Sequence, residues 1–113
     1  MNFKNVDFRI STVKNEDGST EIYFEHVGGW DDFDLILRLL QVENDCKLIS
    51  NREMIYIRKA ELSLNGINFQ LLQDDMFGNY ISTKDDNTVP ALELLAQKVI
   101  DSIVLKLQTR NLI

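Results

Sequence analysis

The sequence predicts an α+β fold, with an antiparallel sheet of about five strands and two helices packed on one face. Asn65-Gly66 is the dipeptide best suited to a two-residue type I′ turn, because both central residues must adopt positive φ. Apolar and polar residues alternate on both sides of this turn, as in strands with one buried face. Two other segments, one after Trp30 and one after Thr88, space their apolar residues at helical intervals. The predicted order is β-β-α-β-β-β-α.

The central hairpin, within residues 54–83, sets the register of the sheet. Folding the chain at Asn65-Gly66 pairs apolar residues on one face, namely Leu64 with Ile67, Leu62 with Phe69, and Ala60 with Leu71. The other face receives polar pairs, Ser63 with Asn68 and Glu61 with Gln70. We therefore expect a sheet that is covered on a single side.

Two strands are predicted before the first helix. Val6, Phe8 and Ile10 alternate with polar residues, and residues 20–27 show the same period of two. The polar segment 15–19 predicts a turn between the two strands, and Gly28-Gly29 ends the second.

The first helix is expected to begin at an N-cap, Asp31, whose carboxylate can accept a hydrogen bond from the amide of Asp34. Trp30 and Leu35 are spaced as a hydrophobic staple around this cap. The acidic residues of this turn also complement the positive end of the helix dipole. The stripe that faces the sheet consists of Phe33, Ile36, Leu37 and Leu40, and the helix should end near residues 42–44. Residues 47–49 are considered as a short strand.

The second half of the chain is expected to contain a turn at residues 74–79, a strand at 80–83 and a long helix. Thr88 is the expected cap of that helix, with Pro90 in its first turn. Its apolar stripe holds helical spacing over Leu92, Leu95, Ala96, Val99, Ile100, Ile103 and Leu107. Leu94 and Leu105 fall outside the main stripe. Either the stripe is wide, or a second apolar face meets a partner or a second copy of the chain.

The composition limits the cellular compartment and the classes of partner that we expect. The 113 residues suffice for one domain (1–113), and the net charge of −6 disfavours nucleic acid and anionic membranes as partners. A basic protein partner would be attracted instead. The lone Cys46, the absence of an apolar leader and the absence of a membrane-length apolar run lead us to expect a cytoplasmic protein.

No motif for catalysis is visible, and we expect a protein that is not an enzyme and needs no cofactor or metal. His26 is the only histidine and Cys46 the only thiol, and no nucleophile motif surrounds either of them. The acidic pairs 31–32, 74–75 and 85–86 lack the alternating ligand spacing of a calcium loop.

The turn at 74–79 is the main candidate for partner binding. Asp74 and Asp75 stand beside Met76, Phe77 and Tyr80, although turns are usually polar. Large apolar groups on an exposed turn mark contact surfaces. The alternative is that Phe77 or Tyr80 folds back into the core. The start of the first helix, with Trp30, Asp31 and Asp32, is the second candidate for the same role.

Three segments carry a resemblance to known families. Residues 29–34 (GWDDFD), 64–67 (LNGI) and 72–79 (LQDDMFGN) resemble small bacterial immunity-type proteins, which accompany polymorphic or contact-dependent toxins, and short uncharacterised bacterial families of similar length. This resemblance implies a cytoplasmic protein that binds and blocks a cognate toxin domain, often through acidic groups that complement a basic cleft.

Two other classes of function are open. One is a homo-oligomeric structural or secretion-chaperone-like protein, which shares the acidic composition and the long C-terminal helix, and which would form a homodimer. The other is a small-molecule or metal-binding domain that uses the acidic loops.

Overall fold

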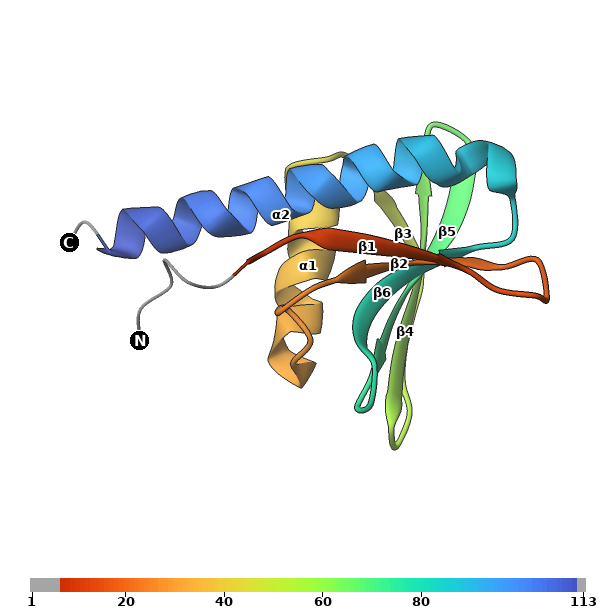
Figure 1. Cartoon of the computed structure of the whole chain (residues 1–113), viewed down its shortest axis with the longest axis horizontal. Helices are drawn as coiled ribbons and strands as arrows, with labels where there is room; N and C mark the ends of the chain where they lie inside the picture. The colour runs from red at the N-terminus through yellow and green to blue at the C-terminus, as the bar shows by residue number, and fades with distance from the viewer. Residues whose placement is uncertain (1–6, 112–113) are drawn as a thin grey trace.

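A six-stranded antiparallel sheet carries both helices on one face in the computed structural model, which describes residues 7–111 (Figure 1). The strand order across the sheet is β1-β2-β6-β5-β4-β3. The elements are β1 (Ile10–Lys14), β2 (Thr20–Phe24), α1 (Trp30–Val42), β3 (Lys47–Glu53), β4 (Ile57–Leu64), β5 (Ile67–Asp74), β6 (Gly78–Thr83), the short 3₁₀ helix η2 (Asp86–Thr88) and α2 (Val89–Asn111). The predicted fold class is confirmed, with one strand more than the expected five.

The additional strand is β3, of which the sequence pattern indicated only residues 47–49. It lies at one edge of the sheet, and most of its side chains are exposed. Its pairing with β4 shifts register between Leu48 and Ser50, so its alternation is broken by a bulge. A polar, bulged edge strand lacks the period that identifies a half-buried strand.

The register predicted for the central hairpin is confirmed at every pair. Leu64 lies opposite Ile67, Leu62 opposite Phe69, and Ala60 opposite Leu71. Asn65 and Gly66 have φ of 51° and 83°, as a type I′ turn requires.

The first strand begins later than the alternation of Val6, Phe8 and Ile10 suggested. It starts at Ile10 and pairs with β2 from Ile10 opposite Phe24 to Lys14 opposite Thr20. Phe8 precedes the strand and packs half-buried against the core, whereas Val6 lies outside the described residues.

Helix α1 starts two residues earlier than a cap at Asp31 would allow, so that prediction is wrong. Gly29 is the N-cap, with extended backbone, and Trp30 is the first helical residue. The carboxylate of Asp32 accepts a hydrogen bond from the Gly29 amide at 3.0 Å, which satisfies a backbone donor at the helix start. The acidic first turn remains favourable for the helix dipole.

Helix α2 is preceded by the single turn η2, which replaces the cap expected at Thr88. The Thr88 hydroxyl donates to the Asp85 carbonyl at 2.7 Å, so it points back along the chain and away from the α2 amides. Pro90 lies in the first turn of α2, as predicted.

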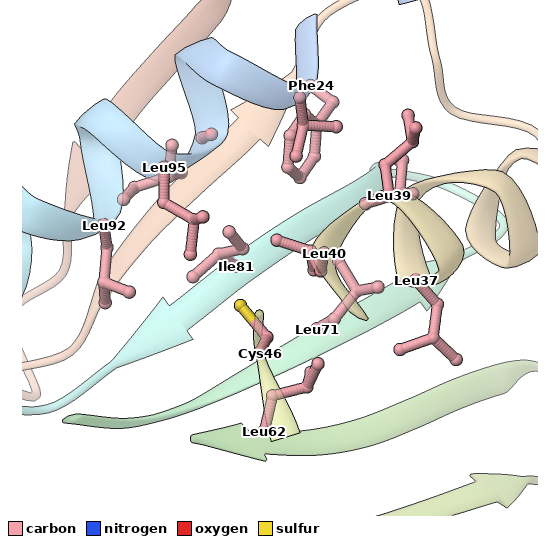
Figure 2. Packing of buried hydrophobic residues seen from close by; sticks show 14 of the residues in the cluster. Phe24, Leu37, Leu39, Leu40, Cys46, Leu62, Leu71, Ile81, Leu92 and Leu95 are labelled. Atoms are coloured by element: carbon pink, nitrogen blue, oxygen red, sulfur yellow. The ribbon is translucent and has the colours of Figure 1, made fainter. Parts of the chain in front are cut away.

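The core lies between the helices and one face of the sheet. In Figure 2, Leu92 and Leu95 of α2 and Leu40 of α1 lie on the same side of the sheet as Ile81 and Leu71, between the helices and the strands. Both predicted helical stripes are buried, except for the half-buried Leu107. Neither described helix combines the length and the apolar character needed to cross a membrane.

Candidate functional site

Two hairpin turns lie side by side at one end of the sheet. Residues 54–56 join β3 to β4, and residues 75–77 join β5 to β6. Ile57 pairs with Asp74, so the first residue of β4 lies beside the last residue of β5 and the two turns are neighbours (Figure 1, lower end of the sheet). We call the five large apolar residues of these turns the hairpin-tip surface: Met54, Ile55, Tyr56, Met76 and Phe77.

All five side chains of the hairpin-tip surface are exposed. The exposed fractions are 49% for Met54, 85% for Ile55, 71% for Tyr56, 84% for Met76 and 62% for Phe77. Contiguous apolar side chains at this exposure are unusual on a soluble domain and mark interaction sites.

The structure answers the question of whether Phe77 or Tyr80 folds back into the core, and neither does. Phe77 lies on the hairpin-tip surface, whereas Tyr80 is half-buried on the sheet face opposite the helices, between the core-facing Asn79 and Ile81. The Tyr80 ring lies 4.9 Å from that of Tyr23, its partner across β2 and β6. Burial is the main cause that raises the pKa of both phenols, that of Tyr23 to about 12.

The two aspartates of the second turn have different surroundings. The Asp74 carboxylate accepts a hydrogen bond from the Met76 amide at 2.7 Å, which shapes the turn. Asp75 is exposed. Asp75 is therefore the freer of the two to meet a partner.

The first turn, residues 54–56, was not expected from the sequence. Three consecutive large apolar residues follow the polar segment 50–53, and this run was interpreted as the start of a strand. The exposed turn could have been suspected, because the strand alternation that leads back from Asn65-Gly66 breaks at Arg58, a charged residue in an apolar position, and at Ile57, an apolar residue in a polar one.

A short strap, residues 27–30, connects β2 to α1 and lies against the bases of both hairpins. Its four successive carbonyl oxygens all accept hydrogen bonds from side chains of the sheet. Asn79 Nδ2 donates to Val27 O at 2.7 Å and to Gly29 O at 3.1 Å. Gln73 Nε2 donates to Gly28 O at 3.3 Å, and Arg58 donates to Trp30 O at 3.1 Å.

The three donors form a buried polar row across β4, β5 and β6. Arg58 pairs with Gln73, and Gln73 pairs with Asn79, so the three side chains are neighbours on the helix-facing side of the sheet. Their exposed fractions are 8%, 2% and 1%. The strap is therefore held by the same strands that carry the hairpin-tip surface.

Arg58 also holds the first turn of α1. Its guanidinium donates two hydrogen bonds to the Asp34 carboxylate, at 2.7 and 3.0 Å, and these lower the pKa of Asp34. It lies 5.2 Å from the ring centre of Trp30 and 4.4 Å from that of Phe33, within cation–π range.

The structure thus brings the two predicted candidate regions to the same end of the molecule. Trp30 is half-buried against Arg58, Asp31 is exposed, and Asp32 is partly occupied by its hydrogen bond to Gly29. Carboxylates border this end of the sheet, contributed by Asp31, Asp32, Glu53, Asp74 and Asp75. Acidic and apolar side chains therefore occur together at this end of the sheet.

Comparisons of the chain with profiles of known families, with curated proteins and with solved structures found no match.

Cys46 and His26, the two residues considered for catalysis, lie in different surroundings. Burial raises the pKa of the Cys46 thiol to about 11, which keeps it protonated at neutral pH. His26 is exposed in the loop after β2, with φ of 66°. Within the described side chains of residues 7–109, no three His, Cys, Asp or Glu side chains are grouped as metal ligands would be.

Proposed function

We propose that the protein is a non-enzymatic binding module that recognises a basic protein domain through the hairpin-tip surface. The observation that carries this proposal is the exposure of five large apolar side chains on two adjacent turns. Polar residues would normally occupy such turns, and nothing in the fold requires apolar ones there.

The chemistry of this end of the sheet fits a protein partner. Apolar and aromatic side chains such as Tyr56 and Phe77 supply the desolvated anchors on which most binding energy depends. The surrounding carboxylates, with the overall charge of −6, would speed the encounter with a basic surface and exclude acidic ones.

The specific role that we propose is that of an immunity protein, which would bind and neutralise a cognate toxin domain in the cytoplasm. Support comes from the resemblance of residues 29–34 and 72–79 to immunity-type proteins, and from the acidic groups around the hairpin tips. Binding would occlude a basic cleft on the toxin, and no chemistry by this chain is needed.

Self-association through α2 is the other candidate, and the outer face of that helix fits it less well. Leu94 and Leu105 are exposed by 61% and 64%, but they lie about 16 Å apart along the helix. Lys98 and Asp101, both exposed, stand between them on the same face. These two leucines therefore serve as a matched control for the hairpin tips.

The test compares two double variants of the tagged protein in its native cells. Ile55→Ser with Phe77→Ser removes apolar area from the hairpin tips, and Leu94→Ser with Leu105→Ser removes similar area from α2. We expect a stoichiometric basic protein to co-purify with the wild type at low salt, to be lost with the tip variant and to remain with the α2 variant. Retention by the folded tip variant, or recovery of the wild type only as a dimer that the α2 variant abolishes, would contradict the proposal.

A further inference from the structure

We infer that the partner-binding surface has a third segment, the first turn of α1, which the buried row Arg58–Gln73–Asn79 positions for binding. This inference rests on the proposed function, because it extends the hairpin-tip surface. The occupant is the same basic protein domain, with Trp30 as a further anchor and Asp31 as a further counter-charge. Arg58, Gln73 and Asn79 are positioning residues, since they act through the strap and remain buried.

The row is geometrically continuous with both hairpin tips. Arg58 directly follows Ile57, the first residue after the turn 54–56. Asn79 directly follows Gly78, the first residue after the turn 75–77. Each end of the row therefore sits at the base of one turn, and its side chains hold the strap from there.

The row fixes the direction of the strap residue by residue. The carbonyls of residues 27, 28, 29 and 30 each receive a side-chain donor from the row. Because four successive carbonyls are held, the strap has little freedom to rotate, and Trp30 leaves it in one direction. The guanidinium of Arg58 then lies over the Trp30 ring at 5.2 Å.

The row is costly for folding. Among the side chains that the structure describes, those of residues 7–109, three buried atoms lack a hydrogen-bond partner, and all three belong to this row: Arg58 Nε, Gln73 Oε1 and Asn79 Oδ1. Buried polar atoms without partners destabilise a fold, and apolar side chains of similar volume are often as good or better. Local departures from stable packing concentrate at functional sites. We infer that these destabilising residues are kept because they hold the strap in position.

The buried row preorganises Trp30 and Asp31 for binding. A tryptophan already held against a guanidinium has less rotational freedom to lose when a partner covers it. Asp31, one residue further, is presented to solvent from the same rigid turn. A partner that covers the hairpin tips would contact Trp30 and Asp31 in conformations that they already hold in the free protein.

Trp30 is the only tryptophan, so its fluorescence reports on the strap directly. In Asn79→Leu, which removes the donor to two carbonyls, we expect a red-shifted emission and stronger quenching by acrylamide. Ile81→Val is the control, because it loosens the core on the same strand without removing a bond to the strap. If Asn79→Leu does not fold, Gln73→Met removes a single 3.3 Å hydrogen bond at nearly constant volume. Unchanged fluorescence in the folded variants would overturn the positioning role.

The second readout is affinity for the basic protein that co-purifies with the wild type. Asn79→Leu should weaken binding about five- to tenfold with intact tips, and Ile81→Val should not. If the Trp30 signal changes while affinity does not, the third segment is excluded from the surface and the inference falls, although the proposed function stands. If the tip variants also keep their affinity, the proposed function itself falls.

Discussion

Gly28 and Gly78 meet without room for a side chain at either position. A Cβ atom built on Gly78 would lie 3.1 Å from the Gly28 Cα, and one built on Gly28 would lie 3.2 Å from the Gly78 Cα. The neighbouring atoms are backbone, so no rotamer change can relieve the contact. This approach fixes the strap against the turn of β5 and β6.

Gly78→Ala should therefore destabilise the protein more than a similar change elsewhere. Gly78 has φ of 85°, and the strain of a left-handed alanine costs about 1–2 kcal/mol before the contact with Gly28 is counted. Gly18 is the matched control, because its φ is 90° and a Cβ there meets nothing within 4 Å. Urea unfolding should show a larger loss for Gly78→Ala than for Gly18→Ala, and equal losses would contradict the close packing.

The hairpin-tip surface should be dispensable for stability. Ile55 and Phe77 are exposed by 85% and 62%, so replacing both with serine should change the free energy of unfolding by no more than about 0.5 kcal/mol. Phe33→Ala, at a fully buried position, should cost about 3–5 kcal/mol. A large loss from the tip variant would show that these side chains serve the fold.

The ion pair of Arg58 and Asp34 should make stability depend on acid pH. The hydrogen bonds from Arg58 lower the pKa of Asp34 from its ordinary 3.8. Because the folded pKa is the lower one, the contribution of Asp34 is present above the unfolded value and is lost as pH falls through the folded pKa. Between pH about 6 and about 3, the wild type should lose more stability than Asp34→Asn, as measured by urea unfolding. If the free energy of unfolding depends on pH in the same way in the wild type and in Asp34→Asn, the ion pair does not make this contribution.

The phenol of Tyr23 should ionise at a higher pH than an ordinary tyrosine. Burial is the main cause that raises its pKa from 10.0 to about 12, with Glu21 adding a nearby negative charge. The folded state therefore holds the phenolic proton more tightly, so its contribution to stability is present below pH 10 and is lost as pH rises through about 12. Absorbance of tyrosinate should show a component in the wild type that is absent in Tyr23→Phe. An unchanged titration in that variant would contradict the prediction.

The sequence was sufficient to predict the parts of the fold that depend on local signals. The Asn65-Gly66 turn defines the register of β4 and β5 by itself, because its two residues must adopt positive φ. The apolar stripes of α1 and α2 repeat at helical spacing and are buried as expected. The α1 cap was misassigned because the helix begins after Gly29, where the Asp32 carboxylate accepts from the Gly29 amide, and Asp31 already lies inside the helix.

The candidate site could be predicted only in part. Met76 and Phe77 stood out because they are apolar in a segment with turn residues, whereas Ile55 and Tyr56 resemble the beginning of a strand. Gln73 and Asn79 gave no signal, because a polar residue facing the core is indistinguishable in sequence from one at the surface. Their partners lie 45 to 52 residues away along the chain, so only the folded sheet brings them to the strap.

The central claim is that the two hairpin tips form the partner-binding surface. Hydrogen–deuterium exchange of the protein, alone and bound to its co-purified basic partner, tests this most directly. We predict that the partner slows exchange at residues 54–56 and 75–77 and leaves the segment around Leu94 to Leu105 of α2 unchanged. Slower exchange confined to α2, with both turns unaffected, would contradict the claim.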